Sequence, residues 1–318
     1  MLNLKPFVFL SVVMLLGILV LGAIGTYIGI MNYSEKEFLR TYGDIEEGTE
    51  LTVDNRDGDV TIRAWDDGHP NAGKIEVHAT LKTVWGKKVL DQTTIEVTDG
   101  PQFRIKTEFE DKARWTVSVD MTIHVPSYIF VTDIETSNGD IDLEGLQGDL
   151  DVDTSNGDAC IKDHNGSVDV HSSNGDVNLN NIRGNAYAYT YNNDITMRDV
   201  TGETKATSGN GRIDIRDVWT VRKAHTSNGA IYLRFQNMSA EGCEVESSNG
   251  NVAVYLPPDT AFRFYLDTSN GNIEVHGFSV KYDESDSDYK KGDVNGGGPK
   301  LDVDTSNGDI DIYAKEGA

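Results

Sequence analysis

A repeated triplet, Ser-Asn-Gly, constrains the fold of this chain more than any other feature. Counting two degenerate forms, the middle position of the triplet recurs every 18 residues from residue 138 to residue 228. Fixed-period self-similarity is typical of stacked repeat folds, in which each unit packs only against its neighbours. The asparagines of this column lie at Asn138, Asn156, Asn174, Asn192, Asn210, Asn228, Asn249, Asn270 and Asn307.

Apolar and polar residues alternate after each triplet, as in Ile141 and Leu143, and again halfway through each unit, as in Leu150 and Val152. This period of two predicts strands with one buried face. We therefore predict an all-β repeat solenoid, like a parallel β-helix or β-roll, with about 18 residues per coil and two turns in each coil.

The triplet is expected to form one corner of each coil. Stacked asparagine amides would bond from coil to coil as a ladder, each bond contributing about 1 kcal/mol net. The neighbouring glycine is expected to supply the positive φ of a tight turn.

Flanking segments extend this repeat region into a complete domain plan. We predict a membrane anchor at 1–31, a polar linker at 32–48, an irregular N-terminal β cap at 49–135, and solenoid repeats at 136–316 with a surface excursion at 283–300. Leu51 to Ile62 resembles an early, degenerate repeat. A cap is needed because the first coil would otherwise expose unpaired strand edges. The expected structural tryptophans are Trp65, Trp85, Trp115 and Trp219.

Residues 7–30 carry no charged side chain and would span roughly 36 Å as a helix, enough for a bilayer core. The run predicts one transmembrane helix and a lipid bilayer as partner. A cleaved signal peptide, which would leave a secreted protein, is the alternative. Basic residues flank both ends of the run, so an extracytoplasmic β domain is a hypothesis.

The formal charge of −24 excludes a nucleic-acid-binding surface, because the chain offers no clustered Lys and Arg. The strand register places Cys160 outward and Cys243 inward. They lie several coils apart, so no disulfide between them is expected.

One acidic column follows the turn glycines, at Asp140, Asp158, Asp176 and Asp194. Carboxylates stacked about 4.8 Å apart repel each other by roughly 0.9 kcal/mol in water. Calcium bound by these side chains and turn carbonyls would relieve the repulsion. The alternative is that the carboxylates face solvent and bond turn amides. No other cofactor is expected.

The sequence contains no nucleophile elbow, dinucleotide fingerprint or Cys/His arrangement, and none of its histidines forms a pair with metal-ligand spacing. We predict that the chain is not an enzyme. A carbohydrate-cleaving β-helix with two carboxylates beside a groove is a further alternative.

Repeats of Thr-Ser-Asn-Gly-Asp-Ile, as at Thr136 to Ile141 and Thr305 to Ile310, closely resemble the putative-adhesin family of β-strand repeats, nominally a domain of unknown function. The resemblance covers roughly Leu51 to Ala314. It implies a β-solenoid ectodomain, anchored in a membrane or secreted, without established catalytic residues.

Together these features predict a non-enzymatic, membrane-anchored cell-surface protein that acts as an adhesin or surface-interaction scaffold. Its partner would be a surface or membrane protein, or a glycan. The alternative is an accessory subunit of an envelope membrane complex or a stress-sensing complex.

Overall fold

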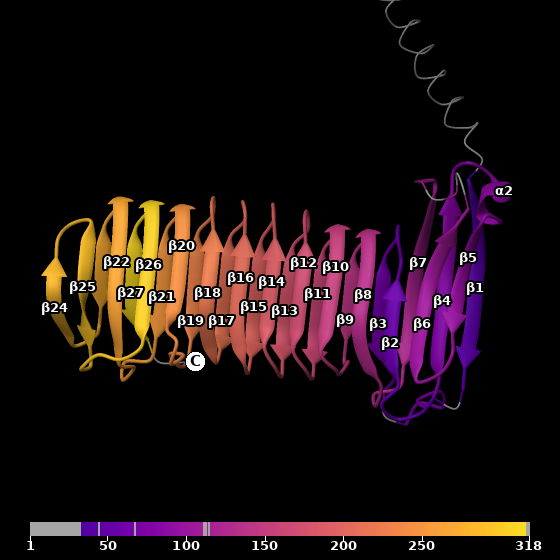
Figure 1. Cartoon of the computed structure of the whole chain (residues 1–318), viewed down its shortest axis with the longest axis horizontal. Helices are drawn as coiled ribbons and strands as arrows, with labels where there is room; N and C mark the ends of the chain where they lie inside the picture. The colour runs from indigo at the N-terminus through magenta and orange to yellow at the C-terminus, as the bar shows by residue number, and fades with distance from the viewer. Residues whose placement is uncertain (1–32, 44, 67, 111–112, 114, 316–318) are drawn as a thin grey trace, which may run out of the picture.

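The computed structural model describes residues 33–315 apart from 44, 67, 111–112 and 114. Two long β-sheets run side by side along an elongated domain, with the N-terminal strands at one end and the C-terminal strands at the other (Figure 1). Most neighbouring strands are parallel, and antiparallel pairs occur only toward the two ends of the sheets in the described part. The predicted all-β, solenoid-like stack is confirmed.

The first sheet has 13 strands in the described chain. In spatial order they are β1 (Ser34–Tyr42), β4 (Ile75–Thr83), β7 (Val117–Val125), β3 (Val60–Ala64), β9 (Ile141–Glu144), β11 (Ala159–His164), β13 (Val177–Ile182), β15 (Ile195–Val200), β17 (Ile213–Val218), β19 (Ile231–Phe235), β21 (Val252–Leu256), β27 (Ile310–Ala314) and β23 (Ile273–His276).

The second sheet has 14 described strands, and one short helix, α2 (Lys87–Leu90), lies at the N-terminal end. In spatial order the strands are β24 (Val280–Ser285), β25 (Tyr289–Val294), β22 (Phe262–Asn270), β26 (Lys300–Asn307), β20 (Cys243–Asn249), β18 (Thr220–Thr226), β16 (Glu203–Ser208), β14 (Ala186–Thr190), β12 (Val168–Ser172), β10 (Leu150–Asn156), β8 (Phe130–Asn138), β2 (Glu50–Asp54), β6 (Gln102–Phe109) and β5 (Thr93–Thr98).

The strand register follows the 18-residue period through the middle of the stack. Val152 pairs with Val170 in the 14-stranded sheet, and Ile161 pairs with Leu179 in the 13-stranded sheet. Alternate residues of both sheets point inward and are almost fully buried. Because each coil places aliphatic side chains directly over those of the last coil, a single core continues along the whole stack.

Both ends of the stack depart from chain order. The coil formed by β2 and β3 lies between β6–β7 and β8–β9, with parallel pairing on both sides. At the other end, β26 and β27 lie between β20–β21 and β22–β23. The first and last coils of the chain are therefore inserted inside the stack, with other strands between them and its ends. This explains why the 18-residue period is lost there.

Two predicted segments differ in the structure. Most of the expected linker at 32–48 forms β1, an edge strand antiparallel to β4 whose side chains are mostly exposed, apart from the partly buried Ser34, Phe38 and Tyr42. The expected surface excursion at 283–300 contains β25, which pairs antiparallel with both β22 and β24. Charged residues cover β24, and a charged edge strand resists pairing with other chains.

The predicted anchor at 7–30 lies outside the described residues. Among the helices that the structure does describe, none has the length and apolar character needed to cross a membrane.

Candidate binding surface

The predicted asparagine column lies along one rim of the stack as an unbroken ladder of side-chain hydrogen bonds. Asn174 Nδ2 donates to Asn156 Oδ1 at 2.9 Å, and Asn192 Nδ2 donates to Asn174 Oδ1 at 2.6 Å. The ladder follows spatial order at the inserted coil, because Asn307 donates to Asn249 and Asn270 donates to Asn307. These side chains are therefore committed to holding coils together.

The glycine beside each asparagine is needed for a different reason from the one expected. Among the glycines of the described triplets, none has a positive φ. An added Cβ on Gly175 would instead lie 1.8 Å from the carbonyl oxygen of Gly157 in the previous coil. Close approach of stacked backbones, and not turn conformation, excludes a side chain at this position.

Positive φ values occur at another corner, which the sequence reasoning missed. This column has the same 18-residue spacing and is occupied by Gly145, Asp163, Asn181, Asp199 and Asp217. Asn and Asp are the residues that best tolerate the left-handed conformation after glycine. The restriction to these residue types at a fixed spacing was the signal that could have identified the corner.

The acidic column predicted as a calcium site forms a second set of rungs beside the ladder. Oδ1 of Asp140 accepts a hydrogen bond from the backbone N–H of Asp158 at 2.8 Å, and Asp158 and Asp176 continue the pattern. The column begins one coil earlier than expected, because Asp59 accepts from the N–H of Asp140. One carboxylate oxygen per coil thus satisfies a turn amide, which is the alternative reading of this column. Calcium binding stays a prediction.

The outward face of the 14-stranded sheet carries a column of positions whose residue type differs in each successive coil. Strand register there aligns one outward residue from each successive coil, and we call this set the outer column. It consists of Asp54, Glu135, Asp153, His171, Tyr189, Thr207, His225 and Glu246. The residues one position earlier in these strands point inward and are aliphatic in every coil. The interior therefore repeats, while the exterior changes from coil to coil.

Carboxylates gather near the cap, both on the outer column and two residues earlier in the same strands, where Asp133 pairs with Asp151. Displacement of water by surrounding protein raises the pKa of Asp133, and the charges of Asp151 and Asp153 raise it further. The same loss of water, followed by the charges of Asp54 and Asp133, raises the pKa of Glu135. The clustered negative charge of these groups disfavours binding of anions to this surface and favours binding of cationic groups.

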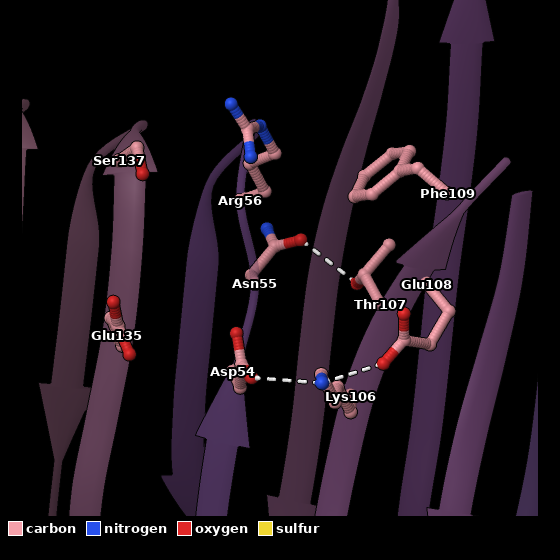
Figure 2. A pocket seen from close by; sticks show the side chains of 9 residues that line it. All are labelled: Asp54, Asn55, Arg56, Lys106, Thr107, Glu108, Phe109, Glu135 and Ser137. Atoms are coloured by element: carbon pink, nitrogen blue, oxygen red, sulfur yellow. Dashed lines mark hydrogen bonds and ion pairs between the residues drawn. The ribbon is translucent and has the colours of Figure 1, made fainter. Parts of the chain in front are cut away.

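A notch opens in this face where the cap meets the first coils. Strand β2 ends at Asp54, whereas β6 continues to Phe109 and β8 continues to Asn138. The resulting cavity of about 320 Å³, the cap notch, opens to the surface (Figure 2). Its lining consists of Asp54, Asn55, Arg56, Lys106, Thr107, Glu108, Phe109, Glu135 and Ser137.

Asn55 forms the floor of the cap notch and is almost fully buried. Its Nδ2 donates to the carbonyl oxygens of Gly58 and Val119, at 3.1 and 2.8 Å. Its Oδ1 accepts from the Thr107 hydroxyl at 2.9 Å. The side chain of Asn55 is fully hydrogen-bonded within the fold, so it shapes the notch. Any contact with a ligand would come from the other residues of the lining.

Charged groups of both signs face the cap notch from β2, β6 and β8 (Figure 2). Lys106 bonds Glu108 at 2.6 Å and lies 3.8 Å from Asp54. Arg56 lies over the exposed ring of Trp115, with 4.4 Å between the guanidinium carbon and the ring centroid. Glu135 forms no ion pair within the described chain. The notch thus offers charges, a hydroxyl and an aromatic edge, which suit binding of a polar group.

Other expected residues take structural or exposed positions. Cys160 and Cys243 are free, and burial raises the pKa of the Cys243 thiol to about 12. Trp65 has a structural role, stacked between two histidine rings with its Nε1 donating to a backbone carbonyl. Trp85, Trp115 and Trp219 are exposed, so the expectation that all four tryptophans are structural was wrong.

One further polar cluster was not predicted. Glu274, His276 and Asp311 bring potential metal-ligating atoms within 4.8 Å of one another at the edge strand β23. His276 also stacks on Tyr313, with ring centroids 4.6 Å apart. His276 Nε2 lies 3.3 Å from a carboxylate oxygen of Glu274 and 3.5 Å from one of Asp311, and these two contacts account for the cluster without a metal.

The fold and its surface define a solenoid-like β-repeat protein with a constant interior and a variable exterior. The chain belongs to the family Toastrack DUF4097, whose sequence model matches residues 48–313. This confirms the resemblance to an adhesin-like β-repeat domain of unknown function.

Several solved structures are similar to the chain at low sequence identity. A putative adhesin from Parabacteroides merdae is 10% identical, covers 89% of this chain and 96% of its own, and has a TM-score of 0.46. A putative adhesin from Parabacteroides distasonis is 11% identical, with coverages of 87% and 97% and a TM-score of 0.44. A putative adhesin from Bacteroides fragilis is 14% identical, with coverages of 88% and 98% and a TM-score of 0.40. No curated protein matches the chain.

Proposed function

We propose that this chain is a non-enzymatic surface-interaction protein of the adhesin type. Residues 7–30 would hold it in the cell membrane, with the β domain outside the cytoplasm. The observation that carries the proposal is the contrast between the two sides of each strand: inward positions repeat aliphatic residues, whereas the outer column changes in every coil. A rigid stack whose residue types vary on an exposed face is suited to contact with a partner surface.

The cap notch and the neighbouring outer column are the proposed contact surface. They combine carboxylates, cations, hydroxyls and aromatic rings around a small open cavity. Within the described lining of the cap notch, no histidine or cysteine is present to act as base or nucleophile. This composition supports non-catalytic binding of a polar surface partner, which would be a protein or a glycan.

Binding to intact cells tests the proposal. The full chain, reconstituted in fluorescent liposomes, is titrated onto cells and compared with empty liposomes. Saturable binding above the empty-liposome level is expected, and binding no greater than that level would contradict the proposal. Repeating the titration with calcium and with a chelator tests the acidic column: loss of binding in chelator would favour a calcium site there.

A further inference from the structure

The edge of the cap at which the chain enters the β domain carries an unusual set of exposed side chains. Ser34 of β1 pairs with Thr83 of β4, and Thr83 pairs with Val117 of β7. The ends of these three adjacent strands therefore lie together on one side of the cap, beside α2 (Figure 1). We call the exposed residues of this edge the cap tip: Tyr33, Val84, Trp85, Lys87, Lys88 and Trp115.

Aromatic side chains at the cap tip face water instead of the core. Trp85 is 68% exposed and Trp115 is 74% exposed, although tryptophan rings usually bury most of their area. Tyr33 and Val84 are exposed beside them. The exposure is therefore a property of the whole edge and not of one side chain.

The backbone behind these rings is held firmly. The hydroxyl of Thr83 donates to the carbonyl oxygen of Thr116 at 2.7 Å and accepts from the N–H of Trp85 at 3.3 Å. Helix α2 packs against β1 and β4 and buries Leu90 completely. The rings are thus presented by an ordered edge.

The cap tip is also basic in a strongly acidic protein. Lys87 and Lys88 are adjacent and exposed, and neither forms an ion pair within the described part of the chain. The nearby carboxylate of Asp91 is paired with Lys36 at 3.6 Å, whereas that of Glu35 accepts from the Tyr33 hydroxyl, a neutral donor, at 2.9 Å. Two unpaired positive charges therefore stand beside the exposed rings.

The position of the cap tip along the chain indicates what covers it. The apolar run ends at Ile30, and Ser34 already belongs to β1. Four residues reach at most about 14 Å, so any bilayer that holds residues 7–30 lies within that distance of the cap tip. Tryptophan, tyrosine and lysine are the side chains enriched where a protein meets lipid headgroups, and lysine is attracted to anionic lipids.

We propose that the cap tip docks on the headgroup layer of an anionic lipid bilayer, with Trp85 and Trp115 at the interface and Lys87 and Lys88 against lipid phosphates. The inference rests on the proposed membrane anchor and adds a second contact to it. The anchor alone would leave the β domain free to rotate, whereas docking of the cap tip would fix its orientation on the membrane.

The test uses the full chain in vesicles of phosphatidylcholine and phosphatidylglycerol that contain a headgroup-labelled nitroxide lipid. Tryptophan emission is expected to be quenched, and the quenched part to fall by roughly half in Trp85→Ser, because two of the four tryptophans lie at the cap tip. Trp219→Ser, which removes an exposed tryptophan between β17 and β18, should leave the quenched intensity unchanged.

Charge is tested with the double variant Lys87→Glu and Lys88→Glu. We expect its quenching in anionic vesicles to fall to the level found in vesicles of phosphatidylcholine alone, while Lys281→Glu on β24 behaves as wild type. Equal quenching in both vesicle types would overturn the charge contact.

Flotation of the vesicles separates the two proposals. Protein that floats with the vesicles but shows no quenching would overturn docking of the cap tip and leave the anchor standing. Protein that does not float would overturn the anchor, and docking of the cap tip with it.

Discussion

At the scale of single residues, the rim of the stack depends on two side-chain requirements that follow from the spacing between coils. The asparagines donate and accept along one line, so removal of one amide breaks bonds to the coils on both sides. The glycines leave room for the carbonyl oxygen of the previous coil. Both requirements recur in almost every coil, which explains why the triplet repeats more faithfully than the rest of the chain.

Asn174→Ala should lower the free energy of unfolding by about 1–2 kcal/mol, since it removes bonds to Asn156 and Asn192 on an exposed rim. Chemical denaturation measures the change. Asn180→Ala, on the outward side of β13, is the control and should change stability by less than about 0.5 kcal/mol. Equal effects of the two substitutions would remove the ladder as a source of stability.

Gly175→Ala should be more damaging, at about 3 kcal/mol or more, because the added methyl group meets the backbone of Gly157. Gly43→Ala serves as the comparison, since an added Cβ there has no neighbour within 4 Å among the described residues. Thermal unfolding of the two variants provides the measurement. A Gly175 variant as stable as the Gly43 variant would show that the coils can move apart at little cost.

Residue types at this rim were largely predictable from the sequence, but their physical roles were only partly so. The ladder follows from the spacing of Asn138 and Asn156, whereas the reason for Gly157 does not, because a turn glycine and a close-contact glycine look alike in sequence. The cap notch could not be predicted at all. It depends on β2 ending before β6 and β8, which are distant in the chain and meet only in the fold.

At the scale of elements, carboxylates are concentrated on the outward face of the 14-stranded sheet, although their mutual repulsion destabilises the fold. The carboxyls of Asp133, Glu135 and Asp169 all have pKa values raised, first by loss of water and then by neighbouring carboxylates. A raised folded-state pKa means that the charged form opposes folding. This cost supports the interpretation that the face is kept for contact with a partner.

Asp133→Asn should therefore raise the unfolding temperature at pH 7, because it removes a repelled charge. The folded state holds the Asp133 proton more tightly than the unfolded state, whose pKa is about 3.9. Wild type should regain stability as the pH falls through the raised folded pKa toward that value, and the advantage of the variant should shrink. Thermal unfolding across this pH range measures the difference.

Asp259→Asn, at an exposed position far from the acidic group, controls for removal of a charge from an acidic protein. Its effect should be smaller at pH 7. An advantage of Asp133→Asn that stays constant down to pH 4 would contradict the proposed repulsion.

At the scale of the whole molecule, the inserted first and last coils secure the ends of the stack. A terminal coil at an open end would lose contacts on one side and fray, whereas β26 and β27 are paired on both sides. The sequence did not reveal this insertion. The final Ser-Asn-Gly triplet keeps its local pattern, and only long-range pairing of Asn307 with Asn249 and Asn270 shows its place.

A chain that ends at Gly298 lacks the inserted coil of β26 and β27. We expect the strands that remain next to the missing coil to lose order as well. Strand β22 would lose its parallel neighbour, so its amides should exchange hydrogen much faster than in wild type. A chain that ends at Lys315 keeps every described strand and should match wild type. Unchanged protection of β22 in the shorter chain would contradict the inserted arrangement.

The most direct test of the whole account is whether the outer column beside the cap notch makes the contact with a partner surface. Liposomes that carry the full chain with Glu135→Lys and Asp153→Lys should lose at least about tenfold in binding to cells, since reversed charge at a contact typically costs more than 1.4 kcal/mol. The matched pair Glu284→Lys and Asp286→Lys, at the other end of the stack, should bind as wild type. Equal binding by both pairs would contradict a role for this face in recognition.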